Sequence, residues 1–151
     1  MDINYYNVLL NVALFGAPEE AKYYANIYPG LADTSGVLVM KYEGFVSSNA
    51  GAKDACGMNH FTIEGEKGYI YAAEPNGLKS IRVVTRSNDE TINLQDSSDR
   101  WSYEIRELVR LMLSDEHEAV NEMLSVSLET VRVMESARLE AEIIFPGDVV
   151  R

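Results

Sequence analysis

Cysteine is almost absent from this chain of 151 residues, which contains Cys56 alone. One thiol can form neither an intramolecular disulfide nor a cysteine-based zinc site, so we expect a reducing, cytoplasmic compartment. The chain also lacks any run of 18 apolar residues, and no segment is therefore expected to cross a bilayer. Its first basic residue is Lys22, whereas a signal peptide would begin with positive charge.

Positive charge is scarce as well. Thirteen lysines and arginines stand against 24 aspartates and glutamates, which gives a net charge of −11. A chain this acidic repels phosphate backbones and anionic lipid surfaces, so we expect neither nucleic acid nor a membrane as partner. The glycine-rich motifs Gly-x-Gly-x-x-Gly and Gly-x4-Gly-Lys-[Ser/Thr] do not occur, so this chain alone is expected to bind no nucleotide cofactor.

The order of the expected elements is one helix, several strands and two helices. Apolar residues make up 46% of the sequence, enough for a core, and the length suits a single domain over residues 1–151. Asparagines at positions 4, 7 and 11 form a narrow polar stripe on an otherwise apolar helix over residues 2–15, which Gly16 should end. The strand-forming runs that follow, separated by turn residues, are Ala21–Tyr28, Val37–Tyr42, Phe45–Lys53, His60–Glu64, Tyr69–Ala73, Ser80–Thr85 and, more weakly, Thr91–Leu94.

The connections between these runs are too short for helical crossovers, so the sheet should be mainly antiparallel. Apolar periodicity predicts a helix over residues 101–112 and a last helix over residues 125–142 with Ser125 as its N-cap, followed by a short strand at 143–145. The expected fold class is therefore α+β: an open, mainly antiparallel sheet of six or more strands with helices packed on one face.

The run Val37–Met40 departs from the pattern of a sheet with one wet face. Its four residues are all apolar, so both faces of the strand carry apolar side chains. Either a loop or another subunit should cover the second face, and we expect a homodimer or a homotetramer.

Asp2 and Tyr6 lie four residues apart and so project from the same side of the first helix. A carboxylate beside a phenol can transfer protons to and from a reacting hydroxyl. The same residues also suit a plainer role, with Asp2 as a helix-start residue and Tyr6 as part of the core.

Several motifs in this order resemble the C-terminal domain of the Gfo/Idh/MocA oxidoreductases, over residues 2 to about 145. They are Met1–Tyr6, Leu14–Pro18, Asp33–Gly36, Lys41–Tyr42, Ala52–Asp54, Ile63–Ile70, Tyr103–Ile105, and Ser125 leading into Val133–Ala137. The resemblance implies an open, mostly antiparallel sheet with helices on one face. Full-length members also have an N-terminal Rossmann domain that holds NAD or NADP.

The family motif Asp-x-Gly-x-[His/Tyr] reads Asp2-Ile3-Asn4-Tyr5-Tyr6 here, with Asn4 in place of the usual glycine. The resemblance thus implies that Tyr6 is the acid/base residue and Asp2 its partner, and that Lys53 matches a family lysine that could face a ligand. The family's Glu-Lys-Pro motif belongs to the Rossmann half, so the chain looks like a domain of a longer enzyme.

Other polar residues have plainer interpretations. Lys53 could equally be a solvated lysine on the sheet, and His60 a residue of its polar face. His117 lies in an acidic stretch where a metal could bind, although a solvated helix turn explains it as well. Cys56 has no basic neighbour after Lys53 to lower its pKa, so no nucleophile is expected there.

Two functions remain open at this stage. The first is the substrate-binding and oligomerisation domain of an NAD(P)-dependent oxidoreductase that acts on a sugar, a cyclitol or a similar polyol, inactive without its cofactor half. The second is a stand-alone, non-enzymatic module of the same fold that binds a small ligand or assembles with partners.

Overall fold

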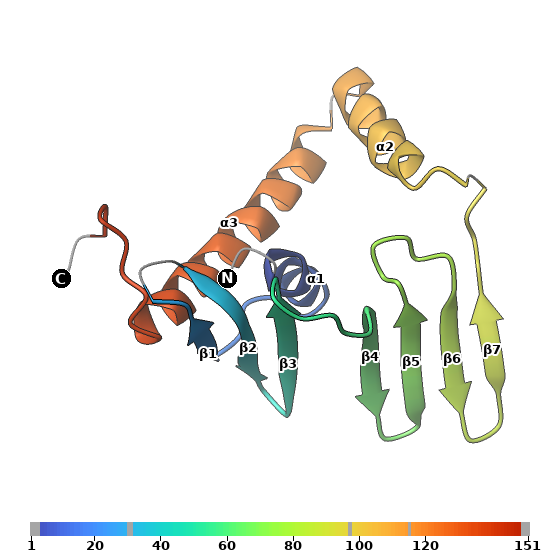
Figure 1. The fold of residues 1–151 in the computed structure, drawn as a ribbon. Coiled ribbons are helices and arrows are strands. Elements are labelled where there is room, and N and C mark those ends of the chain that lie inside the picture. Colours follow the sequence, from blue (N-terminus) through green and yellow to red (C-terminus); the bar gives the residue numbers. More distant parts are fainter. Residues whose placement is uncertain (1–3, 30–31, 97, 115, 149–151) are drawn as a thin grey trace. The chain divides into compact units, whose positions relative to one another are not determined.

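The computed structural model describes residues 4–29, 32–96, 98–114 and 116–148 (Figure 1). They fall into two compact units. The first unit comprises Met1–Cys56 with Glu116–Arg151, and the second comprises Gly57–Asp115. Within these described ranges all strand pairs are antiparallel, and seven strands form two open sheets of three and four strands, which confirms the α+β class.

Helix α1 (Tyr5–Phe15) begins the described part of the first unit. Val8 and Val12 are buried, and the asparagine stripe faces the protein as well, because Asn4 and Asn11 are also buried. Gly16 ends the helix as predicted. Its φ of 78° lies in the left-handed region that favours glycine, and its N–H donates to the Val12 carbonyl.

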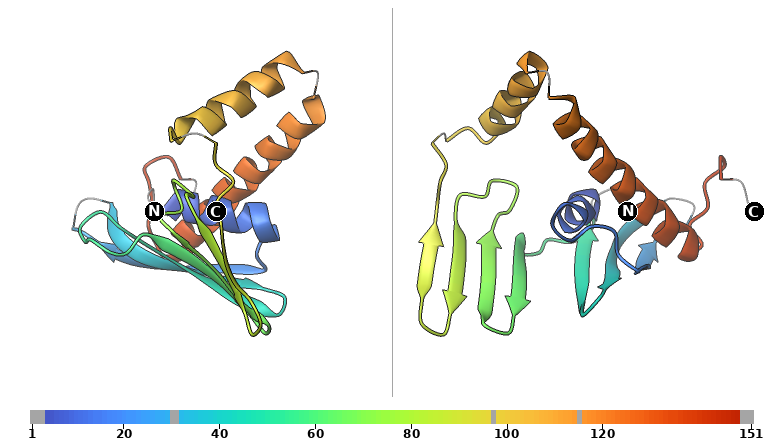
Figure 2. Two further views of the ribbon diagram at one scale, coloured as in Figure 1. Left: turned by 90° about the vertical axis from the view of Figure 1, so that its right-hand side faces the viewer. Right: turned by 180° about the vertical axis from the view of Figure 1, so that it is seen from behind.

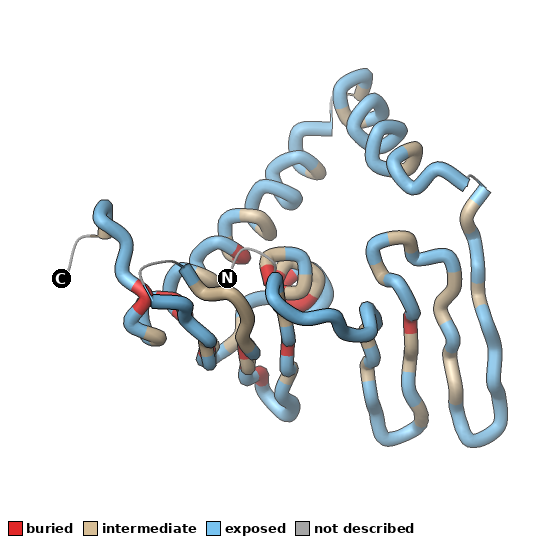
Figure 3. Tube along the Cα trace, viewed as in Figure 1, coloured by how far each residue is buried: buried red, intermediate tan, exposed pale blue. Residues whose placement is uncertain are grey.

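Three strands follow in the order β1 (Glu20–Ile27), β2 (Asp33–Tyr42) and β3 (Phe45–Ala52). Helices α1 and α3 (His117–Glu140) both lie on one face of this sheet (Figure 2). The core forms between these layers. Its buried members are Val8, Val12, Tyr23, Leu38, Met40, Tyr42, Val133, Ala137 and Ile143 (Figure 3).

The apolar run in β2 divides between the two faces, as its sequence predicted. Leu38 and Met40 point to the helices and are fully buried, whereas Val37 and Val39 alternate with them and so lie on the opposite face. The opposite face also carries Tyr24 on β1, which pairs with Val37. Both side chains are exposed. Burial within this chain therefore explains only two of the four residues of the run Val37–Met40.

Helix α3 is longer than predicted. It begins at His117, two turns before Ser125, so the assignment of Ser125 as its N-cap is wrong. The Ser125 hydroxyl instead donates to the Asn121 carbonyl one turn earlier, the local bond that serine makes inside helices. Only the second half of α3 is buried, around Val133 and Ala137.

The predicted strand at 143–145 is also wrong, because side chains bind the backbone groups that a strand would pair. Arg138 donates to the Ile143 carbonyl and also binds the Asp148 carboxylate at 2.6 and 2.8 Å. The Phe145 N–H donates to the same carboxylate. This clamp fixes the segment after α3 against the helix and buries Ile143.

The second unit contains a four-stranded antiparallel meander, β4 (His60–Gly65), β5 (Gly68–Ala73), β6 (Ile81–Thr85) and β7 (Asp89–Ile92). Helix α2 (Trp101–Leu113) follows, and none of its residues is buried. Among the described residues, no helix is long and apolar enough to cross a membrane.

Candidate functional site

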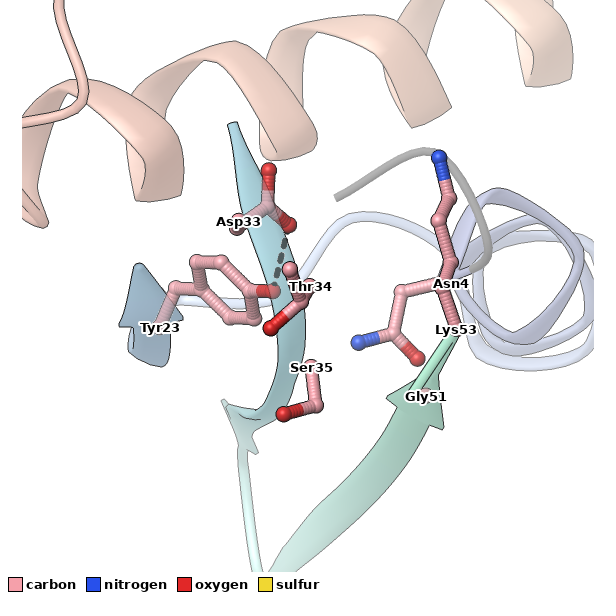
Figure 4. Close-up of a pocket in the computed structure, with 7 residues that line it drawn as sticks. All are labelled: Asn4, Tyr23, Asp33, Thr34, Ser35, Gly51 and Lys53. Atoms are coloured by element: carbon pink, nitrogen blue, oxygen red, sulfur yellow. Dashed lines mark hydrogen bonds between the residues drawn. The ribbon is translucent and has the colours of Figure 1, made fainter. Parts of the chain in front are cut away.

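A small polar pocket lies in the first unit, where the N-terminal end of α1 meets the ends of β2 and β3 (Figure 4). It is lined by Asn4, Tyr23, Asp33, Thr34, Ser35, Gly51 and Lys53. Its volume of about 10 Å³ is room for a single water molecule. A ligand of sugar size would therefore lie over these residues and not within them.

Strand pairing brings the pocket residues together from distant parts of the sequence. The Lys53 N–H donates to the Thr34 carbonyl at 2.7 Å, which extends the pairing of β2 and β3 by one residue and sets Lys53 at the rim. Across the strand, the Tyr23 hydroxyl donates to Asp33 Oδ2 at 2.7 Å (Figure 4). Three strands thus each supply a polar side chain to one spot.

Gly36 allows Tyr23 to reach Asp33. A Cβ atom at position 36 would lie 2.6 Å from the ring of Tyr23, so the ring can hold this position over β2 because residue 36 is a glycine. Burial raises the pKa of the Tyr23 phenol above its ordinary value of 10.0. The phenol is therefore neutral at physiological pH, where it acts as a hydrogen-bond donor.

Charge at the rim comes from groups of both signs. A hydrogen bond from the Thr34 side chain lowers the pKa of the Asp54 carboxyl, which follows Lys53 directly. Lys53 is exposed and carries an ammonium group, which donates hydrogen bonds only. Together with the hydroxyls of Thr34 and Ser35, these groups can bind the hydroxyls of a polyol from several directions.

The asparagine stripe attaches α1 to the sheet beside this pocket. Asn7 Nδ2 donates to Asn4 Oδ1 at 3.0 Å and to the Ala50 carbonyl at 3.2 Å. One turn later, Asn11 Nδ2 donates to Asn49 Oδ1 at 2.9 Å in a buried position. These bonds fix the rotation of the helix about its axis, and hence the direction in which its other side chains point.

Of the residues predicted from the sequence, Lys53 lines the pocket and Tyr6 does not. Tyr6 projects from α1 with 76% of its surface exposed, and its ring meets Tyr5 edge to face at 5.6 Å. Asp2 lies outside the described residues. The structure therefore brings Lys53 to the pocket with Asn4, which occupies the usual glycine position of the motif and is itself buried.

Sequence reasoning missed Tyr23 and Asp33 as members of the site. A signal was present for Asp33, because it begins one of the motifs that carried the family resemblance. Tyr23 gave none, since a tyrosine in an apolar strand is typical of core packing. Its hydroxyl becomes informative only when the partner of that hydroxyl is known.

The remaining candidates have simple environments. His60 and Cys56 are both exposed, and the His60 ring lies 6.0 Å from that of Tyr71. His117 begins α3 and is exposed too. The part of the chain that the structure describes holds no group of three or more residues suited to a metal ion.

Comparison with known proteins gives relatives at moderate identity. No family model matches the sequence. The chain is 28% identical over 149 residues to the scyllo-inositol 2-dehydrogenase (NADP(+)) IolU of Bacillus subtilis, a match that covers 98% of this chain and 45% of that protein. It is 27% identical over 152 residues to the uncharacterized oxidoreductase YgjR of Escherichia coli, covering 100% of this chain and 46% of that protein.

The fold also recurs in solved structures. The aldose-aldose oxidoreductase of Caulobacter crescentus, solved with glycerol, is similar with a TM-score of 0.74 at 15% identity, over 94% of this chain and 44% of that one. At this identity the likeness concerns the fold. The chain spans about half the length of the two curated relatives named above, IolU and YgjR.

Proposed function

We infer that this chain, which corresponds to the C-terminal domain of the Gfo/Idh/MocA oxidoreductases, is a substrate-binding and oligomerisation domain. The whole enzyme would be NAD(P)-dependent and would act on a sugar, a cyclitol or a similar polyol. The observation that carries this proposal is the match to IolU along nearly the whole chain. The names of IolU and of the aldose-aldose oxidoreductase support a polyol substrate.

The residues present in this chain do not fit a dinucleotide cofactor. A dinucleotide fold needs parallel strands joined by helices and a glycine-rich turn at a helix N-terminus. All strand pairs in the described part are antiparallel, and the sequence lacks the glycine motif. The nicotinamide cofactor, NAD or NADP, would therefore be held by the other half of the enzyme, and this chain alone would be inactive.

Tyr6 would exchange the proton of the reacting hydroxyl. Its exposure supports this role, because a phenol that points away from the core can approach a substrate held against the domain. Asp2, four residues earlier in the motif, would orient that phenol or the reacting hydroxyl. Lys53, at the rim of the polar pocket, would donate a hydrogen bond to a more distant hydroxyl of the same substrate.

The exposed face of the three-stranded sheet would bind a second copy of the chain. It presents Tyr24, Val37 and Val46, which are 59%, 39% and 63% exposed, together with Val39. Large exposed apolar patches on soluble proteins mark interaction sites. Burial against its own copy gives a homodimer, or a homotetramer if a second contact forms. A cytoplasmic enzyme would suit the single thiol.

The experiment is a pair of matched tyrosine variants in the intact enzyme, expressed from the coding sequence that includes the cofactor half. Tyr6→Phe removes the proposed proton-transfer hydroxyl, and we expect kcat to fall by about 10²–10⁴-fold with little change in cofactor affinity. Tyr5→Phe removes the neighbouring hydroxyl and should change kcat by less than about threefold.

Equal effects of the two substitutions would refute the role of Tyr6. If the coding sequence encodes no cofactor-binding half, the chain is instead the stand-alone module. In that case the polyol should still be tested for binding by calorimetry, since the polar pocket belongs to this chain.

A further inference from the structure

Cations in this acidic chain are mostly matched with carboxylates. Those within 4 Å of an aspartate or glutamate oxygen include Lys22, Lys41, Arg82, Arg106, Arg110, Arg132 and Arg138. Lys67 and Arg86 differ, because neither forms an ion pair, a hydrogen bond or a ring contact with any residue in the described ranges. With 24 acidic side chains available, two unmatched cations at one place call for a reason.

Lys67 and Arg86 lie together at one end of the four-stranded sheet. Lys67 is in the turn between β4 and β5, and Arg86 is in the turn between β6 and β7 (Figure 1). With Glu66, Thr85 and Ser87 they line one open hollow of about 450 Å³. This is the size range of small-ligand sites and exceeds the polar pocket of the first unit many times over.

Gly68 brings the two turns together. It pairs with Thr85 where β5 begins beside the end of β6. A Cβ atom on residue 68 would collide with the Val84 carbonyl oxygen, so only glycine permits this approach. The turn of Thr85 is itself fixed, since its N–H and hydroxyl both bond to residue Asn88. The hollow is therefore built by backbone contacts, not by chance proximity of long side chains.

We propose that this hollow binds the phosphate group of a small molecule. Lys67 and Arg86 supply two positive charges against the one negative charge of Glu66, which leaves +1 in a chain whose total is −11. The guanidinium of Arg86 can bind two phosphate oxygens side by side, and the Lys67 ammonium adds a point charge. The hydroxyl of Ser87 makes no hydrogen bond to another described residue and can donate to a third oxygen.

The test is calorimetric titration of the full chain with inorganic phosphate at low ionic strength and pH 8, where phosphate is a dianion. We expect a dissociation constant on the order of 1 mM, the range of a single small charged group. The double substitution Lys67→Met and Arg86→Met should weaken this binding at least about tenfold. Lys79→Met is the matched control, because it removes an unmatched cation outside the hollow and should leave binding unchanged.

A second arm separates the two sources of this chemistry. A hexose 6-phosphate that binds more tightly than inorganic phosphate, and loses that advantage in the double variant, identifies a phosphorylated sugar as the ligand. Equal binding of both identifies phosphate alone. The proposal is overturned if titration to about 10 mM phosphate, ten times the expected dissociation constant, gives no heat of binding. It is also overturned if the double variant binds phosphate as tightly as the Lys79→Met control does. None of these outcomes depends on the oxidoreductase function.

Discussion

Replacing Asn11 with alanine removes the buried hydrogen bond that joins α1 to β3. Asn49 Oδ1 then loses its donor at 2.9 Å while Asn49 remains only 8% exposed. A buried acceptor without a partner costs about 1–3 kcal/mol, and alanine returns up to about 0.7 kcal/mol through its higher helix propensity. The net loss in the free energy of unfolding should be about 1–2 kcal/mol, or about 3–6 °C in Tm for a chain of this length.

A double-mutant cycle separates the hydrogen bond from the loss of two side chains. Asn49→Ala alone also gives up the bonds of its amide to the Leu38 carbonyl and Ser47 Oγ. Asn11→Ala combined with Asn49→Ala removes both partners of the Asn11–Asn49 bond, so the double variant should be less destabilised than the sum of the single ones by about 1 kcal/mol. Asn26→Ala is the control, because it removes an exposed amide bond to Ser35 and should cost less than about 0.5 kcal/mol.

Urea unfolding followed by far-UV circular dichroism measures these free energies. Amide hydrogen exchange of the peptides that cover α1 and β3 gives the local response, and protection there should fall in the Asn11→Ala variant. The reasoning fails if Asn11→Ala matches Asn26→Ala, or if the single effects add up to the double one.

The remaining predictions concern assembly, acid and cofactor. Val39→Lys should shift sedimentation from two or four times the 16.9 kDa chain mass to one, whereas Met40→Lys should unfold the chain, because only Met40 faces the core; a folded Met40→Lys monomer would contradict this. Hydrogen bonds from Arg138 and from the Phe145 N–H lower the pKa of Asp148 from 3.8 to about 2, so its contribution to stability is complete above pH 4 and is lost as the pH falls towards 2. Asp148→Asn should therefore lower Tm at pH 7 and have little effect at pH 2; an equal effect at both would exclude the clamp. Fluorescence titration of the chain with NADH or NADPH should show no micromolar binding, and such binding would refute the two-half account.

The strands could be predicted because turn residues divide them clearly. Gly16 ends α1, and the predicted runs agree with the seven strands to within a few residues. The start of α3 could not be read in the same way. Ser125 is a good N-cap type, yet nothing local distinguishes a serine that caps a helix from one that bonds within it. Ile143 was predicted to lie in a strand, but its carbonyl accepts a hydrogen bond from the side chain of Arg138 and not from a neighbouring strand.

The candidate site shows the same boundary between local and non-local information. A motif singled out Lys53 as a candidate, and in the structure Lys53 is one of the residues that line the polar pocket. Tyr23 was not identified, because its partner becomes known only from the strand pairing. Tyr23 lies opposite Leu38, and its hydroxyl bonds to Asp33, which precedes Leu38 by five residues in β2. The hydrogen bond from Tyr23 to Asp33 depends on the register of β1 and β2 and on Gly36 within β2. Neither is visible in a pattern of apolar residues.

The contact between Gly36 and the Tyr23 ring has an evolutionary consequence. Any side chain at position 36 enters the space of that ring, so a substitution there must be accompanied by a displacement of the ring or by a smaller residue at position 23. The loss of that ring would in turn leave the Asp33 carboxylate without the phenol that it now accepts from. Positions 23, 33 and 36 should therefore co-vary among homologues, so that a substitution at one of them is accompanied by a substitution at another.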